Sequence, residues 1–245
     1  MNHIVCLSGG KDSTAMAIRL RELSNQQYIY ICTPTGDELP EMFDHWLRIE
    51  KILNQPLIRL QDPESPTIYD LIDHFKMLPN WRARWCTRIL KIELAQRFYE
   101  LVKPAVIYVG LRADEMGRKG NKLFDENIEQ KYPMQDWGWG ISEVHNYLDK
   151  NKIKIPLRTD CAMCFYQRIG EWWNLWKFYP DRLQRIIDIE SKLGHTLLSP
   201  GKWTNWPHKL SDLRKEFESG RIPKGANSNH SLFDDDSGRC RVCSL

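Results

Sequence analysis

The chain has 245 residues, of which 42% are hydrophobic and 27% are charged, and its mean hydropathy is −0.54. No apolar run approaches the roughly 20 residues that span a bilayer, and no basic and apolar signal segment precedes the first predicted strand, so we expect no membrane association and a cytoplasmic location. The net charge of +3 is too small to indicate a nucleic-acid partner by itself. Without an export signal, the seven cysteines favour metal binding or thiol chemistry over disulfides.

The first predicted element is a strand over 4–7, which leads through two glycines into an apolar-periodic helix. The connecting segment is Ser8-Gly9-Gly10-Lys11-Asp12-Ser13-Thr14. Glycines allow the backbone to approach an anion closely, and bare N–H groups at a helix N-terminus suit a phosphate. Lys11 adds a positive charge, Asp12 is a candidate for Mg²⁺, and the hydroxyl groups are donors or helix caps. An ordinary capped strand-to-helix turn is the alternative.

Further strands are predicted near 28–32, 57–60 and 105–109, with helices between them. The predicted helices carry apolar stripes at Met16, Leu20 and Leu23; at Met42, Trp46, Ile49 and Leu53; and at Leu90, Leu94, Phe98 and Leu101. This alternating order predicts an α/β fold with a doubly wound parallel sheet, whose ligands bind at the carboxyl ends of the strands. The glycine loop and Gly110-Leu111-Arg112 are expected at that edge.

Charged residues follow two of these strands. Asp37 and Glu38 come after Gly36, where they suit ribose hydroxyls or Mg²⁺, or else a turn and a helix start. Arg112 follows the strand at 105–109, and Arg118 and Lys119 lie in the next loop. Arginine can bind a phosphate or sulfate through two parallel hydrogen bonds.

The character of the chain changes after about residue 120. A helix is expected around 141–148, and the region beyond Cys164 is helical, with a stripe of Trp172, Trp176 and Tyr179. Such a stripe is more often core than a base-stacking platform. We therefore expect a nucleotide-binding core over 1–120, the remainder of the core with a helical Cys- and Trp-rich region over 121–224, and a tail over 225–245.

The cysteines form two closely spaced pairs, Cys161-x-x-Cys164 and Cys240-x-x-Cys243. Alone, two such pairs favour a closed tetrahedral zinc site. Cys86 stands between Arg84 and Arg88 ahead of a predicted helix, a setting that lowers a thiol pKa and favours thiolate. The sequence leaves the kind of metal open.

Several segments together resemble the adenine-nucleotide alpha hydrolases, the superfamily of sulfonucleotide (PAPS/APS) reductases, ATP sulfurylase small subunits and thiolating ATP pyrophosphatases. Ser8 to Thr14 is similar to their pyrophosphate (PP) loop. In order, the other segments are Thr35-Gly36-Asp37-Glu38-Leu39-Pro40-Glu41, Trp85-Cys86-Thr87-Arg88 with Lys91, Gly110-Leu111-Arg112-Ala113-Asp114-Glu115, Tyr132-Pro133 with Trp137, and Cys161-Ala162-Met163-Cys164. The similarity covers about the first three-quarters of the chain.

The resemblance implies an enzyme that binds ATP or PAPS/APS with Mg²⁺. It implies nucleotide binding by Ser8, Gly9, Gly10, Lys11, Asp12, Ser13, Thr14, Gly36, Asp37, Gly110 and Arg112, with Lys11, Asp12 and Arg112 catalytic. It also implies a 4Fe–4S cluster on Cys86, Cys161, Cys164 and one of Cys240 and Cys243, with Zn²⁺ as the alternative.

Two departures bear on the reaction. Cluster-containing reductases have paired cysteines where this chain has only Trp85-Cys86, and their catalytic tail resembles Glu-Cys-Gly-x-His, which Arg239-Cys240-Arg241 does not match. A single cysteine in this setting is closer to the DNA phosphorothioation sulfur-transfer enzymes. We expect an ATP pyrophosphatase with sulfur transfer, whose candidate partners are a nucleic-acid acceptor and a sulfur-donor or redox protein. A sulfonucleotide reductase and a nucleotide sensor with structural zinc are the alternatives.

Overall fold

The computed structural model describes residues 1–64, 67–115, 125–199 and 205–226. Its centre is a five-stranded parallel sheet with the order β3-β2-β1-β4-β5. The strands are β1 (Asn2–Cys6), β2 (Ile29–Cys32), β3 (Leu57–Arg59), β4 (Ala105–Tyr108) and β5 (Ile128–Lys131). The helices are α1 (Lys11–Leu23), α2 (Pro40–Leu53), α3 (Ile68–Phe75), α4 (Trp85–Thr87), η1 (Arg88–Glu93), α5 (Leu94–Val102), η2 (Ala113–Glu115), α6 (Pro133–Asp136), α7 (Ile141–Lys150), α8 (Ile169–Phe178), α9 (Pro180–Leu193) and α10 (Leu210–Glu218).

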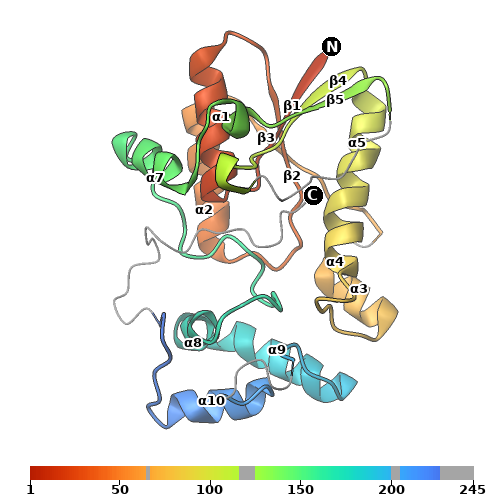
Figure 1. Cartoon of the computed structure of the whole chain (residues 1–245). Coiled ribbons are helices and arrows are strands. Elements are labelled where there is room, and N and C mark those ends of the chain that lie inside the picture. The colour runs from red at the N-terminus through yellow and green to blue at the C-terminus, as the bar shows by residue number, and fades with distance from the viewer. Residues whose placement is uncertain (65–66, 116–124, 200–204, 227–245) are drawn as a thin grey trace.

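Helices cover both faces of the sheet, which confirms the predicted α/β class. Figure 1 shows α1, α2 and α7 on one side of the strands and α5 on the other. Met16, Trp46 and Val144 pack on the first face, while Ala95 and Tyr99 pack on the second. Because both faces are covered, the central strands are almost continuously apolar, and β4 is buried along its whole length.

Three details differ from the sequence prediction. The edge strand β5 was not predicted, because Ile128-Glu129-Gln130-Lys131 has a single apolar residue, and it is held by pairing with β4. Leu23 and Leu101 complete predicted apolar stripes, yet 53% and 83% of their surfaces are exposed, because they lie at the last turns of α1 and α5 beyond the sheet.

A second hydrophobic core joins α8, α9 and α10 to α3 and α4. Trp172 is completely buried in it, and Trp176 packs on Phe217, so this tryptophan stripe is core. Residues 68–90 thus pack with residues 162–217. Most of the predicted tail, and Arg118 and Lys119, lie outside the described residues. Within the described part of the chain, every helix is too short or too polar to cross a bilayer.

Candidate active site

The glycine loop connects β1 to α1 and is fixed from the side by α2. Gly9 has a φ of 91°, and a Cβ there would lie 2.6 Å from Trp46 Nε1. The same indole nitrogen donates a 3.0 Å hydrogen bond to the Ser8 carbonyl. The positive φ and the close indole together explain why this position requires glycine.

The first turn of α1 carries a compact charged cluster. The Lys11 ammonium lies 3.0 Å from Asp12 Oδ2, and the Arg112 guanidinium reaches the same oxygen at 3.0 Å. Lys11 is buried, and this burial lowers its pKa, although Asp12 opposes the shift. The other oxygen, Asp12 Oδ1, is buried and has no hydrogen-bond partner among the described residues. Asp12 therefore keeps one oxygen for a cation or a donor.

Arg112 joins the loop after β4 to α1. Its Nε donates to Asp114 at 2.8 Å, and Glu115 lies 3.5 Å from Nη2. Burial acts to lower the pKa of Arg112, but the carboxylates of Asp12, Asp114 and Glu115 outweigh it and hold the pKa above its usual value. The backbones also approach closely, since a Cβ at Gly110 would lie 3.2 Å from the backbone of Ser13.

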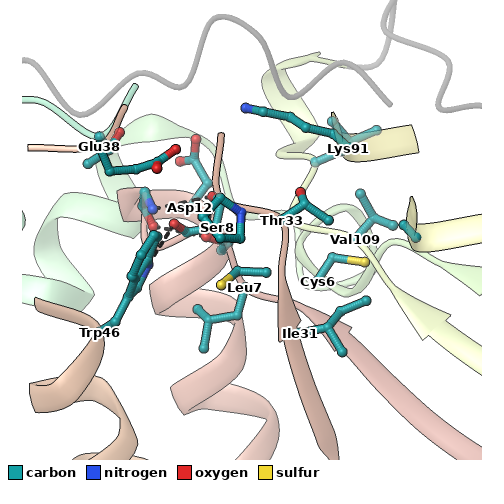
Figure 2. Close-up of a pocket in the computed structure, with 18 of the residues that line it drawn as sticks. Cys6, Leu7, Ser8, Asp12, Ile31, Thr33, Glu38, Trp46, Lys91 and Val109 are labelled. Carbon is teal, nitrogen blue, oxygen red and sulfur yellow. Dashed lines mark hydrogen bonds between the residues drawn. The ribbon is translucent and has the colours of Figure 1, made fainter. Parts of the chain in front are cut away.

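A pocket opens at the carboxyl edge of the sheet beside this cluster (Figure 2). Of the predicted nucleotide-binding residues, Ser8, Gly10, Asp12, Ser13 and Gly110 line it. Glu38 and Lys91, which the sequence placed in motifs, also line it, whereas sequence reasoning had not selected as site residues Cys6, Cys32, Thr33, Trp46, Tyr99 and Thr159. They come from five separate segments, and only the fold brings them together.

The other predicted nucleotide-binding residues lie near this pocket or behind it. Gly9, Lys11, Thr14 and Arg112 belong to the loop and cluster just described. Gly36 has a φ of 78°, and a Cβ there would lie 2.5 Å from Thr67 Cγ2. Asp37 is fully buried and faces Tyr69, Arg182 and Met163. Nucleotide binding by these residues stays a prediction.

Three predicted metal ligands converge on a second pocket. Cys86, Cys161 and Cys164 line it together with Thr35 and Lys91. Within the described ranges, no group of three or more His, Cys, Asp or Glu side chains is arranged to hold a metal ion by itself. The remaining predicted ligands, Cys240 and Cys243, lie outside the described residues.

The thiols differ in acidity. The expected low pKa of Cys86 is wrong in this structure: burial raises it, and the Lys91 ammonium offsets this only in part. The pKa of Cys164 is lowered, because the Cys161 thiol donates a hydrogen bond to its sulfur. Arg158 holds the loop of these two cysteines by donating to the Cys161 carbonyl at 2.7 Å.

Lys91 belongs to the walls of both pockets. It lies on η1, a π-helical turn between the short helix that carries Cys86 and the helix that carries Tyr99. Figure 2 shows its side chain extending across the rim of the first pocket. Such turns occur frequently at functional sites. The sequence placed Lys91 in a motif, but gave no sign of the π turn that sets its direction.

Comparison with known proteins identifies relatives. The family model of the phosphoadenosine phosphosulfate reductase domain matches residues 2–174. A solved phosphoadenylyl-sulfate (PAPS) reductase from Candida auris, in a phosphate complex, is 16% identical with a TM-score of 0.50, over 63% of this chain and 75% of that one. An NH3-dependent NAD synthetase from Campylobacter jejuni is 15% identical with a TM-score of 0.41, over 91% and 88%. No curated protein sequence matches.

Proposed function

This chain belongs to the phosphoadenosine phosphosulfate reductase domain family, and we propose that it is an enzyme that uses an adenine nucleotide for sulfur chemistry at the adjacent cysteines. The observation that carries the proposal is the shared wall at Lys91, which lines both the loop pocket and the cysteine pocket. A phosphate bound at the glycine loop and a sulfur bound at the cysteines would thus lie on either side of Lys91.

The nucleotide would bind with its phosphates at Ser8, Gly10 and Ser13. In the proposed reaction an acceptor oxygen attacks the α-phosphorus of ATP, the bond to the β-phosphate breaks, and pyrophosphate leaves. Lys11 and Arg112 supply positive charge where negative charge develops on the phosphate oxygens. A sulfur nucleophile then takes the place of the adenylated oxygen on the acceptor, and AMP leaves with that oxygen.

Mg²⁺ fits this site through Asp12. The buried Oδ1 that lacks a described partner is an oxygen donor beside the proposed phosphate position, and Mg²⁺ prefers one or two carboxylates plus phosphate oxygens. When bound, the ion would neutralise phosphate charge, while Lys11 and Arg112 fix the orientation of the carboxylate.

The cysteine pocket suits a soft metal group. Three cysteines line this one pocket with Lys91 in its wall, although their side chains are not arranged around a metal position within the described residues, and thiolates are the ligands of iron–sulfur clusters. The proposed fourth ligand is Cys240 or Cys243. Gly225, at the end of the described chain, touches helix α8 at Gly170, and Cys240 follows 15 residues later. A segment of that length extends to at most about 50 Å. Such a cluster would supply electron transfer or sulfur coordination.

Two arginine–aromatic pairs beside this pocket support a nucleic-acid acceptor. The Arg82 guanidinium lies 4.6 Å from the centre of the Trp81 ring, and that of Arg84 lies 5.8 Å from Tyr166. Phe165 lines both the cysteine pocket and the hollow between Trp81 and Tyr166. Aromatic rings with flanking cations suit stacked bases and their phosphates. A single-stranded oligonucleotide is therefore the acceptor to test first.

The second candidate is a sulfonucleotide reductase, which family membership favours. A tail thiolate would attack the sulfur of PAPS or APS, so that the sulfur–oxygen bond breaks and the nucleotide leaves. Thioredoxin-dependent sulfite release from PAPS, lost in Cys240→Ser or in Cys243→Ser, would favour this reaction over ATP cleavage.

The test uses full-length protein purified without oxygen. We expect iron and acid-labile sulfide, and pyrophosphate release from ATP that Asp12→Asn reduces at least about a hundredfold. Cys86→Ser and Cys161→Ser should lose iron, whereas the matched control Cys32→Ser, a buried cysteine outside the cysteine pocket, should keep it. A colourless protein with stoichiometric zinc and no turnover of ATP or PAPS would instead indicate a nucleotide sensor.

A further inference from the structure

The carboxylate of Asp37 is fully buried, lines neither pocket and plays no part in the reaction proposed above. We propose that Asp37 is a positioning residue: it fixes the Cys161–Cys164 loop to the nucleotide-binding edge of the sheet. The consequence for catalysis rests on the proposed function, but the positioning itself can be measured without turnover.

Two hydrogen bonds join Asp37 to the cysteine loop. The Met163 N–H donates to Oδ2 at 2.8 Å, and the Ala162 N–H donates to the Asp37 carbonyl at 2.8 Å. Both donors lie between the two cysteines in the sequence. Side chain and main chain of one residue therefore fix the backbone that presents both sulfurs.

The other carboxylate oxygen is held from the helical part of the chain. The Tyr69 hydroxyl on α3 donates to Oδ1, and Arg182 Nη1 on α9 lies 3.2 Å from the same oxygen. The Arg185 guanidinium packs 3.4 Å from the centre of the Tyr69 ring. Three donors thus converge on one carboxylate. Asparagine cannot replace it, because its amide NH₂ would face a donor on one side or the other.

The turn that carries Asp37 reaches both pockets. Thr35 lines the cysteine pocket, and Glu38 lines the nucleotide pocket. The Glu38 carboxylate accepts hydrogen bonds from the Thr35 N–H at 2.7 Å and the Gly36 N–H at 3.0 Å, so the turn is closed on itself. A rigid turn with a pocket at each end transmits the position of one site to the other.

The experiment compares Asp37→Asn with the wild type by backbone hydrogen exchange and by iodoacetamide labelling of individual cysteines, on anaerobically purified protein. Glu190→Gln is the matched control, because Glu190 is also a buried carboxylate that accepts two backbone N–H groups, at 2.8 and 2.9 Å, but outside both pockets. Calorimetry measures ATP affinity in every variant.

We expect exchange at Met163, and labelling of Cys161 and Cys164, to rise at least about tenfold in Asp37→Asn, as the loss of a hydrogen bond to a charged group predicts. Glu190→Gln should leave exchange and labelling at the cysteine loop unchanged, because Glu190 lines neither pocket. If Asp37→Asn does not fold, Tyr69→Phe, which removes one anchor, should still raise exchange at Met163 about threefold.

Unchanged exchange at the cysteine loop in both variants would overturn the proposal. So would an equal rise in Glu190→Gln, which would indicate general loosening. Reduced ATP affinity with an unchanged loop would make Asp37 a nucleotide ligand instead. A wild type without ATP or PAPS turnover would refute the proposed function, and the exchange comparison would still decide the role of Asp37.

Discussion

Replacing Gly9 by alanine tests the glycine loop most directly. Alanine must adopt a φ of 91° there, and its methyl group would lie 2.6 Å from Trp46 Nε1 and 2.8 Å from Met42 Cε. The backbone conformation costs about 1–2 kcal/mol, and forcing an extra carbon into a packed site costs about 1–3 kcal/mol more. We expect the free energy of unfolding to fall by about 2–5 kcal/mol.

Gly138→Ala is the matched control. Gly138 also has a positive φ, 67°, but a Cβ there would meet nothing within 4 Å. The Gly138→Ala variant therefore carries only the cost of the backbone conformation. Urea denaturation should show Gly9→Ala to be less stable than Gly138→Ala by about 1–3 kcal/mol. Displacing Trp46 also removes the hydrogen bond to Ser8, so ATP affinity should fall only in Gly9→Ala. Equal destabilisation of the two variants, with wild-type ATP binding by Gly9→Ala, would refute this reasoning.

Three further outcomes are expected. Arg112→Met leaves Lys11 as the charged partner of the Asp12 carboxylate and should weaken ATP binding about tenfold to a hundredfold by calorimetry, whereas Arg19→Met, at an exposed ion pair, should not. Burial lowers the pKa of His45 to about 4, below its unfolded value of 6.5. The contribution of neutral His45 to stability is therefore complete above pH 6.5 and is lost as the pH falls towards 4, at up to about 1.4 kcal/mol per pH unit. In His45→Gln the midpoint of urea denaturation should depend less on pH over that range. In Gly170→Ala the new Cβ would lie 2.5 Å from the Gly225 carbonyl carbon, so urea denaturation should show a loss of about 1–3 kcal/mol; a wild-type midpoint would contradict this contact.

The parts of the fold that local patterns determine could be predicted from the sequence. The glycine loop, the apolar strands and the tryptophan-rich core follow from chain-local periodicity, and membership of the family followed from the order of the motifs. The strand β5 could not be predicted, because its polar residues are held by the neighbouring strand β4 rather than by their own β propensity.

The candidate site divides in the same way. Ser8, Asp12 and Gly110 could be selected from the sequence because each belongs to a contiguous motif whose residues also line the pocket. The contacts of Asp37 were not found, because its partners Met163 and Arg182 follow it by 126 and 145 residues. The acidity expected for Cys86 was wrong for a related reason: neighbouring arginines are visible in the sequence, whereas burial depends on the whole fold.

The π turn at η1 sets how far α4, which carries Cys86, is rotated about the helix axis relative to α5, which carries Tyr99. A π turn is equivalent to one extra residue inserted into an α-helix, and one residue corresponds to a rotation of about 100°. Deleting a single residue from 88–93 would restore a regular helix, but would rotate Cys86 by that angle around the axis relative to Ala95 and Tyr99. The cysteine would then leave its pocket while Ala95 and Tyr99 stayed in the wall of the nucleotide pocket, so the length of this segment is constrained as well as the identity of Lys91.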